Sequence, residues 1–231
     1  MCKYKYLLFD LDDTLLDFKK AEYYGIKAVF EKMGITVSDE NIELYSKINL
    51  SCWKQYEQGE ITREDIYKNR VVQFGEKIGV DIDVEEFSDT YFYTLSRQGQ
   101  TMPYAFELMD ALSKKDYVIA AATNGALVPQ TFRIVNSGLA GFFKGGIFVS
   151  EQIGFRKPEP EFFEYLLKEL RVKDKGEVLV IGDSLSSDIA GAVSLGLDSC
   201  FVNLRSEEVS YKGDFTYSVC SLKDLIKVCG L

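Results

Sequence analysis

Five short segments of the chain carry dense runs of apolar side chains without the strict alternation of a half-exposed strand. They cover residues 4–9, 117–122, 146–149, 177–181 and 198–202. Short runs of this kind are typical of strands that are buried on both faces, as in a parallel sheet. Amphipathic helical patterns follow three of the segments. Strands that alternate with helices predict an α/β fold, with a Rossmann-like parallel sheet and helices on both of its faces.

Residues 16–98 interrupt this alternation. The interval shows no convincing buried strand, and helical patterns cover residues 19–33, 40–58, 63–78 and 84–96. The simplest organisation is a helical module inserted between the first two core strands. The sequence therefore predicts an α/β core formed by residues 1–15 and 99–231, and an all-helical cap domain between them.

The chain contains no histidine. This excludes Ser-His-Asp and Cys-His catalysis, histidine phosphatases and His-based zinc hydrolases. Proton transfer in an enzyme of this composition must use carboxylates, Lys, Tyr, Cys or metal-bound water. The formal net charge of −9 argues against nucleic acid or an anionic membrane surface as a bulk partner, because both would be repelled. A small anionic substrate is compatible with this charge if a cation bridges it to the protein.

Neither a targeting segment nor a membrane span is expected. Asp10 precedes any long apolar run, and no run approaches the roughly 18 apolar residues that a membrane helix needs. The five cysteines include no CxxC pair, so neither a disulfide framework nor a zinc site is indicated. We therefore expect a cytoplasmic protein with reduced thiols.

Carboxylates follow two of the predicted strands directly, where α/β proteins place their ligands. Asp10 and Asp12 lie in an apolar-DxDxT segment after the first strand. Two acids this close repel unless a cation lies between them or one is protonated. Asp183 follows the strand at 177–181 and suits a hard cation, with Asp188 placed to orient the site. Taken singly, each segment is also compatible with a turn and a helix N-cap.

Phosphate ligands are suggested by two further segments. Thr123, Asn124 and Gly125 end another buried strand, where a hydroxyl and backbone N–H groups can bind phosphate oxygens. Lys157 lies just before a helix, a favourable position for an anion. Alone, the first segment is also a common turn and the second an ordinary surface lysine. Together the four segments supply convergent carboxylates, a hydroxyl and an ammonium group, which matches Mg²⁺-assisted phosphoryl transfer through an aspartyl phosphate.

The four segments resemble, in order and in full, the motifs of the haloacid dehalogenase (HAD) superfamily of phosphohydrolases. The resemblance covers the whole chain, including a helical cap inserted after the first motif. It implies that Asp10 attacks phosphorus and becomes the aspartyl phosphate. It also implies that Asp12 protonates the leaving alkoxide and later deprotonates the hydrolytic water. True dehalogenases lack an acid at the position of Asp12, so its presence favours phosphatase chemistry.

The same resemblance assigns the remaining residues. Mg²⁺ would be held by the Asp10 carboxylate, the Asp12 backbone carbonyl and Asp183. Asp188 would support the metal shell. The phosphoryl oxygens would be held by Thr123, Asn124 and Lys157, the first through its hydroxyl and the second through its backbone.

The predicted cap resembles that of the pyrimidine 5′-nucleotidase branch, through segments that include residues 49–53, residues 59–62 and Arg70. This resemblance implies a small-molecule partner, a pyrimidine (deoxy)nucleoside monophosphate, with Trp53 or Tyr56 stacking on the base. Aromatic residues at helical spacing are also typical of a core. A sugar phosphate or phosphoglycolate phosphatase, a phosphomutase and a phosphoryl-accepting signalling module remain as alternatives, and the sequence leaves the oligomeric state open.

Overall fold

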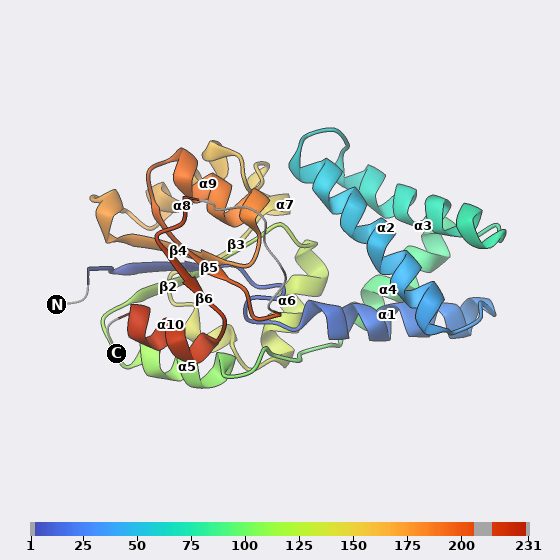
Figure 1. Cartoon of the computed structure of the whole chain (residues 1–231), viewed down its shortest axis with the longest axis horizontal. Helices are drawn as coiled ribbons and strands as arrows, with labels where there is room; N and C mark the ends of the chain where they lie inside the picture. The colour runs from blue at the N-terminus through green and yellow to red at the C-terminus, as the bar shows by residue number, and fades with distance from the viewer. Residues whose placement is uncertain (1–2, 206–213, 230–231) are drawn as a thin grey trace. The chain divides into compact units, whose positions relative to one another are not determined.

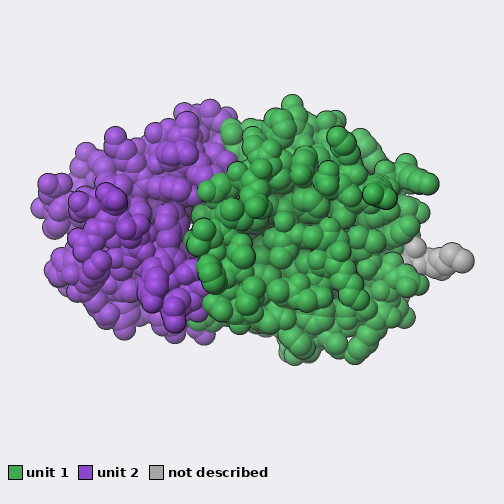
Figure 2. Space-filling view, turned by 180° about the vertical axis from the view of Figure 1, so that it is seen from behind, with its two compact units in different colours: residues 1–18, 99–231 green, residues 19–98 purple. Residues whose placement is uncertain are grey.

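The computed structural model describes residues 3–205 and 214–229. The chain divides into two compact units, which are coloured separately in Figure 2. Unit 1 combines Met1–Phe18 with Gly99–Leu231, and unit 2 is the continuous segment Lys19–Gln98.

Six parallel strands form the sheet of unit 1, in the order β3-β2-β1-β4-β5-β6 (Figure 1). Every residue of the central strand β1 is buried, as expected for a strand covered on both faces. The parallel sheet confirms the predicted α/β fold. The strands are β1 (Tyr6–Phe9), β2 (Val118–Thr123), β3 (Gly146–Val149), β4 (Val178–Gly182), β5 (Asp198–Val202) and β6 (Tyr217–Val219).

Helices cover both faces of this sheet (Figure 1). They are α5 (Ala105–Ser113), α6 (Leu127–Asn136), α7 (Ser150–Ile153), α8 (Pro160–Glu169), α9 (Ala190–Ser194) and α10 (Leu222–Val228), with the short turns η1 (Ala140–Phe142), η2 (Lys175–Glu177) and the π-helical η3 (Leu185–Ile189). Successive strand residues point to opposite faces. Phe9 therefore packs in the hydrophobic cluster that includes α5 and α10, and Leu8 packs in the cluster that includes α8 and α9.

The order of the strands brings three strand ends together. β1 pairs with β2 on one side and with β4 on the other, and Phe9 lies opposite Ala121 and Ile181. All three strands run in the same direction, so the chain leaves them at the same edge of the sheet. This edge is the point at which ligands bind in open α/β sheets, because the strand order changes direction there. Asp10 and Asp183 are the first residues after β1 and β4.

Four helices make up unit 2, and local side-chain caps fix the starts of three of them. Ser38 and Asp83 accept hydrogen bonds from backbone N–H groups three residues ahead, and Thr62 forms a capping box with Asp65. Their interior is aromatic: Phe30 and Phe74 stack at 5.1 Å between ring centroids. The helices are α1 (Phe18–Met33), α2 (Asp39–Glu57), α3 (Arg63–Ile78) and α4 (Val84–Ser96).

Two details of unit 1 differ from the sequence-based expectation. Residues 16–18 belong to unit 1, because Leu16 pairs with Asp12 and Thr101 in isolated β-bridges and the N–H of Asp17 donates to the Gln100 carbonyl at 2.9 Å. The second difference is the edge strand β6, which is too short to leave a recognisable pattern.

The described cysteines Cys52, Cys200, Cys220 and Cys229 form no disulfide with one another, and Cys2 lies outside the described residues. Among the helices that the structure describes, none combines the length and the apolar character needed to cross a membrane.

Candidate active site

Lys157 connects two of the predicted carboxylates at the strand ends. Its Nζ donates to Asp10 Oδ1 and to Asp188 Oδ1, both at 2.6 Å, and to the carbonyl oxygen of Ala122 at 2.8 Å. The lysine is only 2% exposed, and Asp10 and Asp188 are also buried. A buried ammonium group is tolerated when its hydrogen-bonding capacity is used, and here all three donors have a partner.

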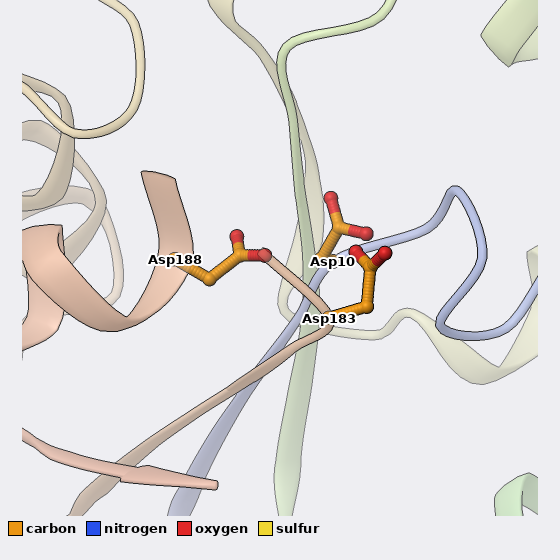
Figure 3. Close-up of side chains that lie close together, drawn as sticks. All are labelled: Asp10, Asp183 and Asp188. Carbon is orange, nitrogen blue, oxygen red and sulfur yellow. The ribbon is translucent and has the colours of Figure 1, made fainter. Parts of the chain in front are cut away.

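Three carboxylates meet at this point. One oxygen from each of Asp10, Asp183 and Asp188 lies within 4.8 Å of the other two. In Figure 3 the carboxylates of Asp10 and Asp183 lie next to each other at the strand ends, and that of Asp188 extends toward them from its helical turn. Lys157 forms ion pairs with Asp10 and Asp188, and among the described residues Asp183 forms none. The three acids of the cluster thus have one ammonium group beside them. The cluster is therefore acid-rich, and its oxygens are the ligands that hard divalent cations prefer.

The electrostatics of the cluster reflect this excess of acid. Burial raises the pKa of Asp10 to about 7, with Lys157 lowering it and the neighbouring Asp188 and Asp12 raising it further. Burial likewise raises the pKa of Asp183, and the charges of Asp10 and Asp188 add to the effect. Burial alone would lower the pKa of Lys157, but the two carboxylates outweigh it, and its pKa lies above the usual value. The lysine is thus held charged beside acids that a cation would stabilise.

The position of Asp188 depends on the glycine in front of Asp183. A Cβ at Gly182 would lie 2.2 Å from Asp188 Oδ2, so only glycine leaves room for this carboxylate. Asp188 Oδ2 accepts the N–H of Ser184 at 3.1 Å, and the Ser184 hydroxyl accepts the N–H of Ser187 at the start of the π-helical turn η3. The Gly-Asp-x-x-x-x-Asp spacing therefore folds both acids back onto the end of β4.

Asn124 has a contact that the sequence did not predict. Its side-chain Nδ2 donates to the carbonyl oxygen of Lys157 at 2.8 Å, and its Oδ1 accepts the N–H of Lys157 at 2.9 Å. This reciprocal pair fixes the backbone of the lysine to the end of β2, although the two residues lie 33 positions apart. The side chain of Asn124 therefore positions Lys157.

Asp12 points to a different set of partners from Asp10. Its Oδ1 accepts from Arg133 NH1, and its Oδ2 accepts from Gln130 Nε2 at 2.8 Å. The same Gln130 amide nitrogen donates to Thr123 Oγ1 at 2.8 Å, and Thr123 Oγ1 also accepts the N–H of Gly125 at 3.0 Å. Asp12 and Thr123 are thus linked through one glutamine, while Asp10, Asp183 and Asp188 form the acidic cluster.

Sequence reasoning missed Gln130 and Arg133. Both are 1% exposed on α6, whereas the apolar Val128, Phe132 and Val135 of the same helix are more than half exposed. The helix therefore turns two polar residues inward at a spacing of three. The signal available was a Gln and an Arg three residues apart in a helix that directly follows a motif.

Trp53 and Tyr56, the predicted base-stacking residues, both lie on α2 of unit 2. Tyr56 is buried and its hydroxyl accepts from Arg63 NH2 at 3.0 Å. The ring centroids of Trp53 and Tyr56 are 5.8 Å apart in an edge-on arrangement, and Trp53 is partly exposed. Tyr56 is therefore committed to contacts within unit 2, and Trp53 has the more accessible ring.

Comparisons with known proteins identify the family of this chain. Residues 4–196 match the family model described as haloacid dehalogenase-like hydrolase. The chain belongs to the haloacid dehalogenase-like hydrolase family, as its four motifs predicted. Its parallel α/β fold is the fold of that family.

Three individual proteins are similar to this chain over nearly its whole length. Pyrimidine 5′-nucleotidase PynA of Streptococcus pneumoniae is 34% identical over 223 residues, which are 96% of this chain and 94% of that protein. Pyrimidine 5′-nucleotidase YjjG of Escherichia coli is 27% identical over 96% of each chain. The crystal structure of YfnB of Bacillus subtilis bound to magnesium matches with a TM-score of 0.92 and 33% identity, covering 99% of this chain and 100% of that one. These relatives confirm the predicted enzyme class, a hydrolase of the phosphatase type.

Proposed function

We propose that this protein is a Mg²⁺-dependent phosphatase that works through an aspartyl phosphate on Asp10. The observation that carries the proposal is the contact of Lys157 Nζ with Asp10 Oδ1 at 2.6 Å, within a cluster of three carboxylates. A carboxylate attacks a phosphate dianion only where positive charge offsets the repulsion between them. Lys157 supplies one positive charge, and the acid-rich cluster can bind another.

The residues present fit a magnesium ion. Asp10, Asp183 and Asp188 offer hard oxygen donors within 4.8 Å of one another, and their excess negative charge favours a divalent cation. We assign Asp10 and Asp183 as carboxylate ligands, with the Asp12 carbonyl completing the protein's share. Asp188 supports this set while it holds Lys157. When bound, the ion would neutralise charge on the phosphoryl group during its transfer.

The chemistry proceeds in two displacements. In the first, a carboxylate oxygen of Asp10 forms a bond to phosphorus, the ester P–O bond breaks, and Asp12 gives its proton to the leaving oxygen. In the second, water attacks phosphorus, its proton passes to Asp12, and the bond between Asp10 and phosphorus breaks. Inorganic phosphate leaves and both aspartates return to their starting states. This sequence needs no histidine, because Asp12 performs both proton transfers.

The phosphoryl oxygens are assigned to three groups near the strand ends. They are the Thr123 hydroxyl, the Asn124 backbone and the Lys157 ammonium group. Thr123 lies at the end of β2, and the side chain of Asn124 fixes the backbone of Lys157. Hydrogen bonds from fixed groups of this kind stabilise a transferring phosphoryl group without reorganisation.

We further propose pyrimidine (deoxy)nucleoside monophosphates as the substrate class. The support is the similarity to two enzymes named pyrimidine 5′-nucleotidases, at 34% and 27% identity over almost the whole chain. Stacking of the base on Trp53 or Tyr56 stays a prediction, and the exposure of the two rings favours Trp53. A cytoplasmic location also stays a prediction from the sequence.

A phosphate-release screen tests the proposal. The panel contains UMP, dUMP, dTMP and CMP, with purine monophosphates, sugar phosphates and phosphoglycolate as competitors, each measured with Mg²⁺ and with EDTA. We expect the highest kcat/KM for a pyrimidine monophosphate and no turnover in EDTA. Preference for a sugar phosphate or phosphoglycolate would replace the substrate class and keep the mechanism. Failure to release phosphate from any ester with Mg²⁺ would refute the phosphatase itself.

A further inference from the structure

The carboxylate of Asp12 is held at both oxygens by side chains from one helix. Arg133 NH1 donates to Oδ1 and Gln130 Nε2 donates to Oδ2 at 2.8 Å. Arg133 NH1 also donates to Gln130 Oε1 at 2.9 Å, so the two α6 side chains are joined to each other as well. The Asp12 side chain keeps 28% of its surface exposed, whereas that of Arg133 keeps 2%. Arg133 and Gln130, which we call the clamp, therefore fix the carboxylate of Asp12 and leave one side of it accessible.

Burial of these two residues needs an explanation other than packing. Taking a guanidinium group out of water is unfavourable unless a counter-charge compensates it. The compensating group here is Asp12, and the guanidinium also lies 5.6 Å from the ring centroid of Phe18. An apolar residue at position 133 would pack in the same place without that cost. The arginine thus serves the carboxylate that it contacts.

The backbone next to the clamp is adapted to the glutamine. A Cβ at Gly125 would lie 2.6 Å from both Cγ and Nε2 of Gln130, so the side chain occupies space that only a glycine leaves. From this position one amide nitrogen reaches Asp12 Oδ2 and Thr123 Oγ1, each at 2.8 Å. Gln130 therefore joins the proton-transfer residue to the hydroxyl assigned to the phosphoryl group.

We propose that Arg133 and Gln130 are positioning residues, which hold the Asp12 carboxyl group in the orientation needed for proton transfer to the leaving oxygen. The inference rests on the proposed function, because it assigns the clamp to the acid-base residue of that mechanism. A free Asp side chain rotates about two bonds, and each misdirected orientation lowers the fraction of molecules able to deliver the proton. The clamp removes this freedom while the exposed side of Asp12 faces solvent or substrate.

The leaving group provides a readout that separates positioning from structure. A nitrophenolate ion leaves without protonation, whereas the alkoxide from a nucleoside 5′-phosphate needs the proton of Asp12. The ratio kcat/KM reports the steps up to the first phosphoryl transfer. We therefore expect Arg133→Met to lower kcat/KM about 100-fold or more for the best nucleotide, within the range of general acid catalysis, and at least about tenfold less for p-nitrophenyl phosphate. The loss should fall on kcat, with KM changed little.

Three further variants complete the experiment. Arg133→Lys restores a cation and should recover part of the nucleotide activity. Gln130→Met should show the same selective loss at smaller size, and it keeps the proposal testable if Arg133→Met does not fold. Thr131→Ala, on the exposed side of α6, is the matched control and should leave kcat/KM for both substrates unchanged. Each variant is first checked by thermal unfolding.

The possible outcomes are distinct. Equal losses for both esters in folded Arg133→Met and Gln130→Met, or no loss at all, would overturn the positioning role. A wild-type enzyme that cleaves neither ester would instead refute the proposed function, and the clamp would lose its assigned purpose with it.

Discussion

Both units bury charged side chains, but the two sets are composed differently. In unit 1, Asp10 and Asp188 share the single ammonium group of Lys157, and Asp183 lies beside them without an ion pair among the described residues. The acids therefore outnumber the base. Their raised pKa values, in Asp10 and Asp183, express the cost of holding like charges together away from water.

The buried network of unit 2 contains one carboxylate and one guanidinium group, with an amide between them. Asn49 Nδ2 donates to Glu22 Oε1 at 2.7 Å, and Arg70 NH1 donates to Asn49 Oδ1 at 3.1 Å. The guanidinium carbon of Arg70 lies 4.6 Å from the ring centroid of Tyr91, a favourable cation–π distance. Charge of each sign is present, so this network stabilises the helices without an added ion.

The two clusters differ in whether their charges are balanced without a bound ion. A network that contains its own counter-charge has its charges balanced when the chain has folded. An acid-rich cluster reaches its lowest free energy only after a cation binds, so stability and metal binding are coupled there. We therefore propose that the acidic cluster of unit 1 is the functional one and that the polar network of unit 2 is structural.

The largest effect is expected from removing the one base of the acidic cluster. Lys157→Met leaves Asp10 and Asp188 buried without a counter-charge, which should lower the free energy of unfolding by about 3–5 kcal/mol. Phosphatase activity should be lost as well, because the attacking carboxylate and the phosphate would repel each other. Urea unfolding and phosphate release measure the two effects. Lys168→Met, an exposed lysine of α8, is the matched control and should change stability by less than about 0.5 kcal/mol. A stable and active Lys157→Met variant would contradict the account.

The next prediction is that removing one carboxylate charge changes the free energy of unfolding in opposite directions in the two units. In EDTA, Asp183→Asn removes one of several like charges from a buried cluster and should raise the free energy of unfolding. Glu22→Gln makes the same chemical change in unit 2 but removes the counter-charge of Arg70. It should lower the free energy of unfolding by about 1–3 kcal/mol. Urea unfolding of both variants in EDTA checks this, and effects of the same sign would remove the distinction between the networks.

A smaller effect concerns pH. The pKa of Asp10 is raised to about 7 in the folded protein, so between its ordinary value and pH 7 the folded state binds a proton that the unfolded state has lost. Metal-free protein should therefore lose stability as the pH rises through this window. Protons compete with Mg²⁺ for the same oxygens, so the rise in melting temperature caused by Mg²⁺ should be larger at about pH 8 than at about pH 5.5. Thermal unfolding with Mg²⁺ and with EDTA measures it. A magnesium effect that is independent of pH would argue against Asp10 as a ligand.

Most of the fold was predictable because its signals are local. The helices Arg63–Ile78 and Val84–Ser96 have the bounds expected from their periodicity, and capping side chains mark their starts. The strands Gly146–Val149 and Asp198–Val202 likewise match the apolar runs. The meeting of Asp10 and Asp183 followed from the rule that parallel strands end at one edge of a sheet.

The hydrogen bonds that hold Lys157 and Asp12 in place were not predictable from local signals. The bonds from Asn124 to the Lys157 backbone join residues 33 positions apart, and that from Gln130 to Asp12 joins residues 118 positions apart. Periodicity also misleads on α6, because its apolar Val128 and Phe132 are exposed while its polar residues face inward. The buried side of that helix is the one whose Gln130 and Arg133 contact Asp12, a residue distant in the sequence.

Titration of Mg²⁺ into the metal-free protein by calorimetry shows whether the acidic cluster binds the ion. We expect one saturable site in the wild-type protein, loss of binding in Asp183→Asn, and unchanged binding in Glu22→Gln. Absence of Mg²⁺ binding by the folded wild type, or equal binding by Asp183→Asn, would contradict the assignment of the acidic cluster as the metal centre of a phosphatase.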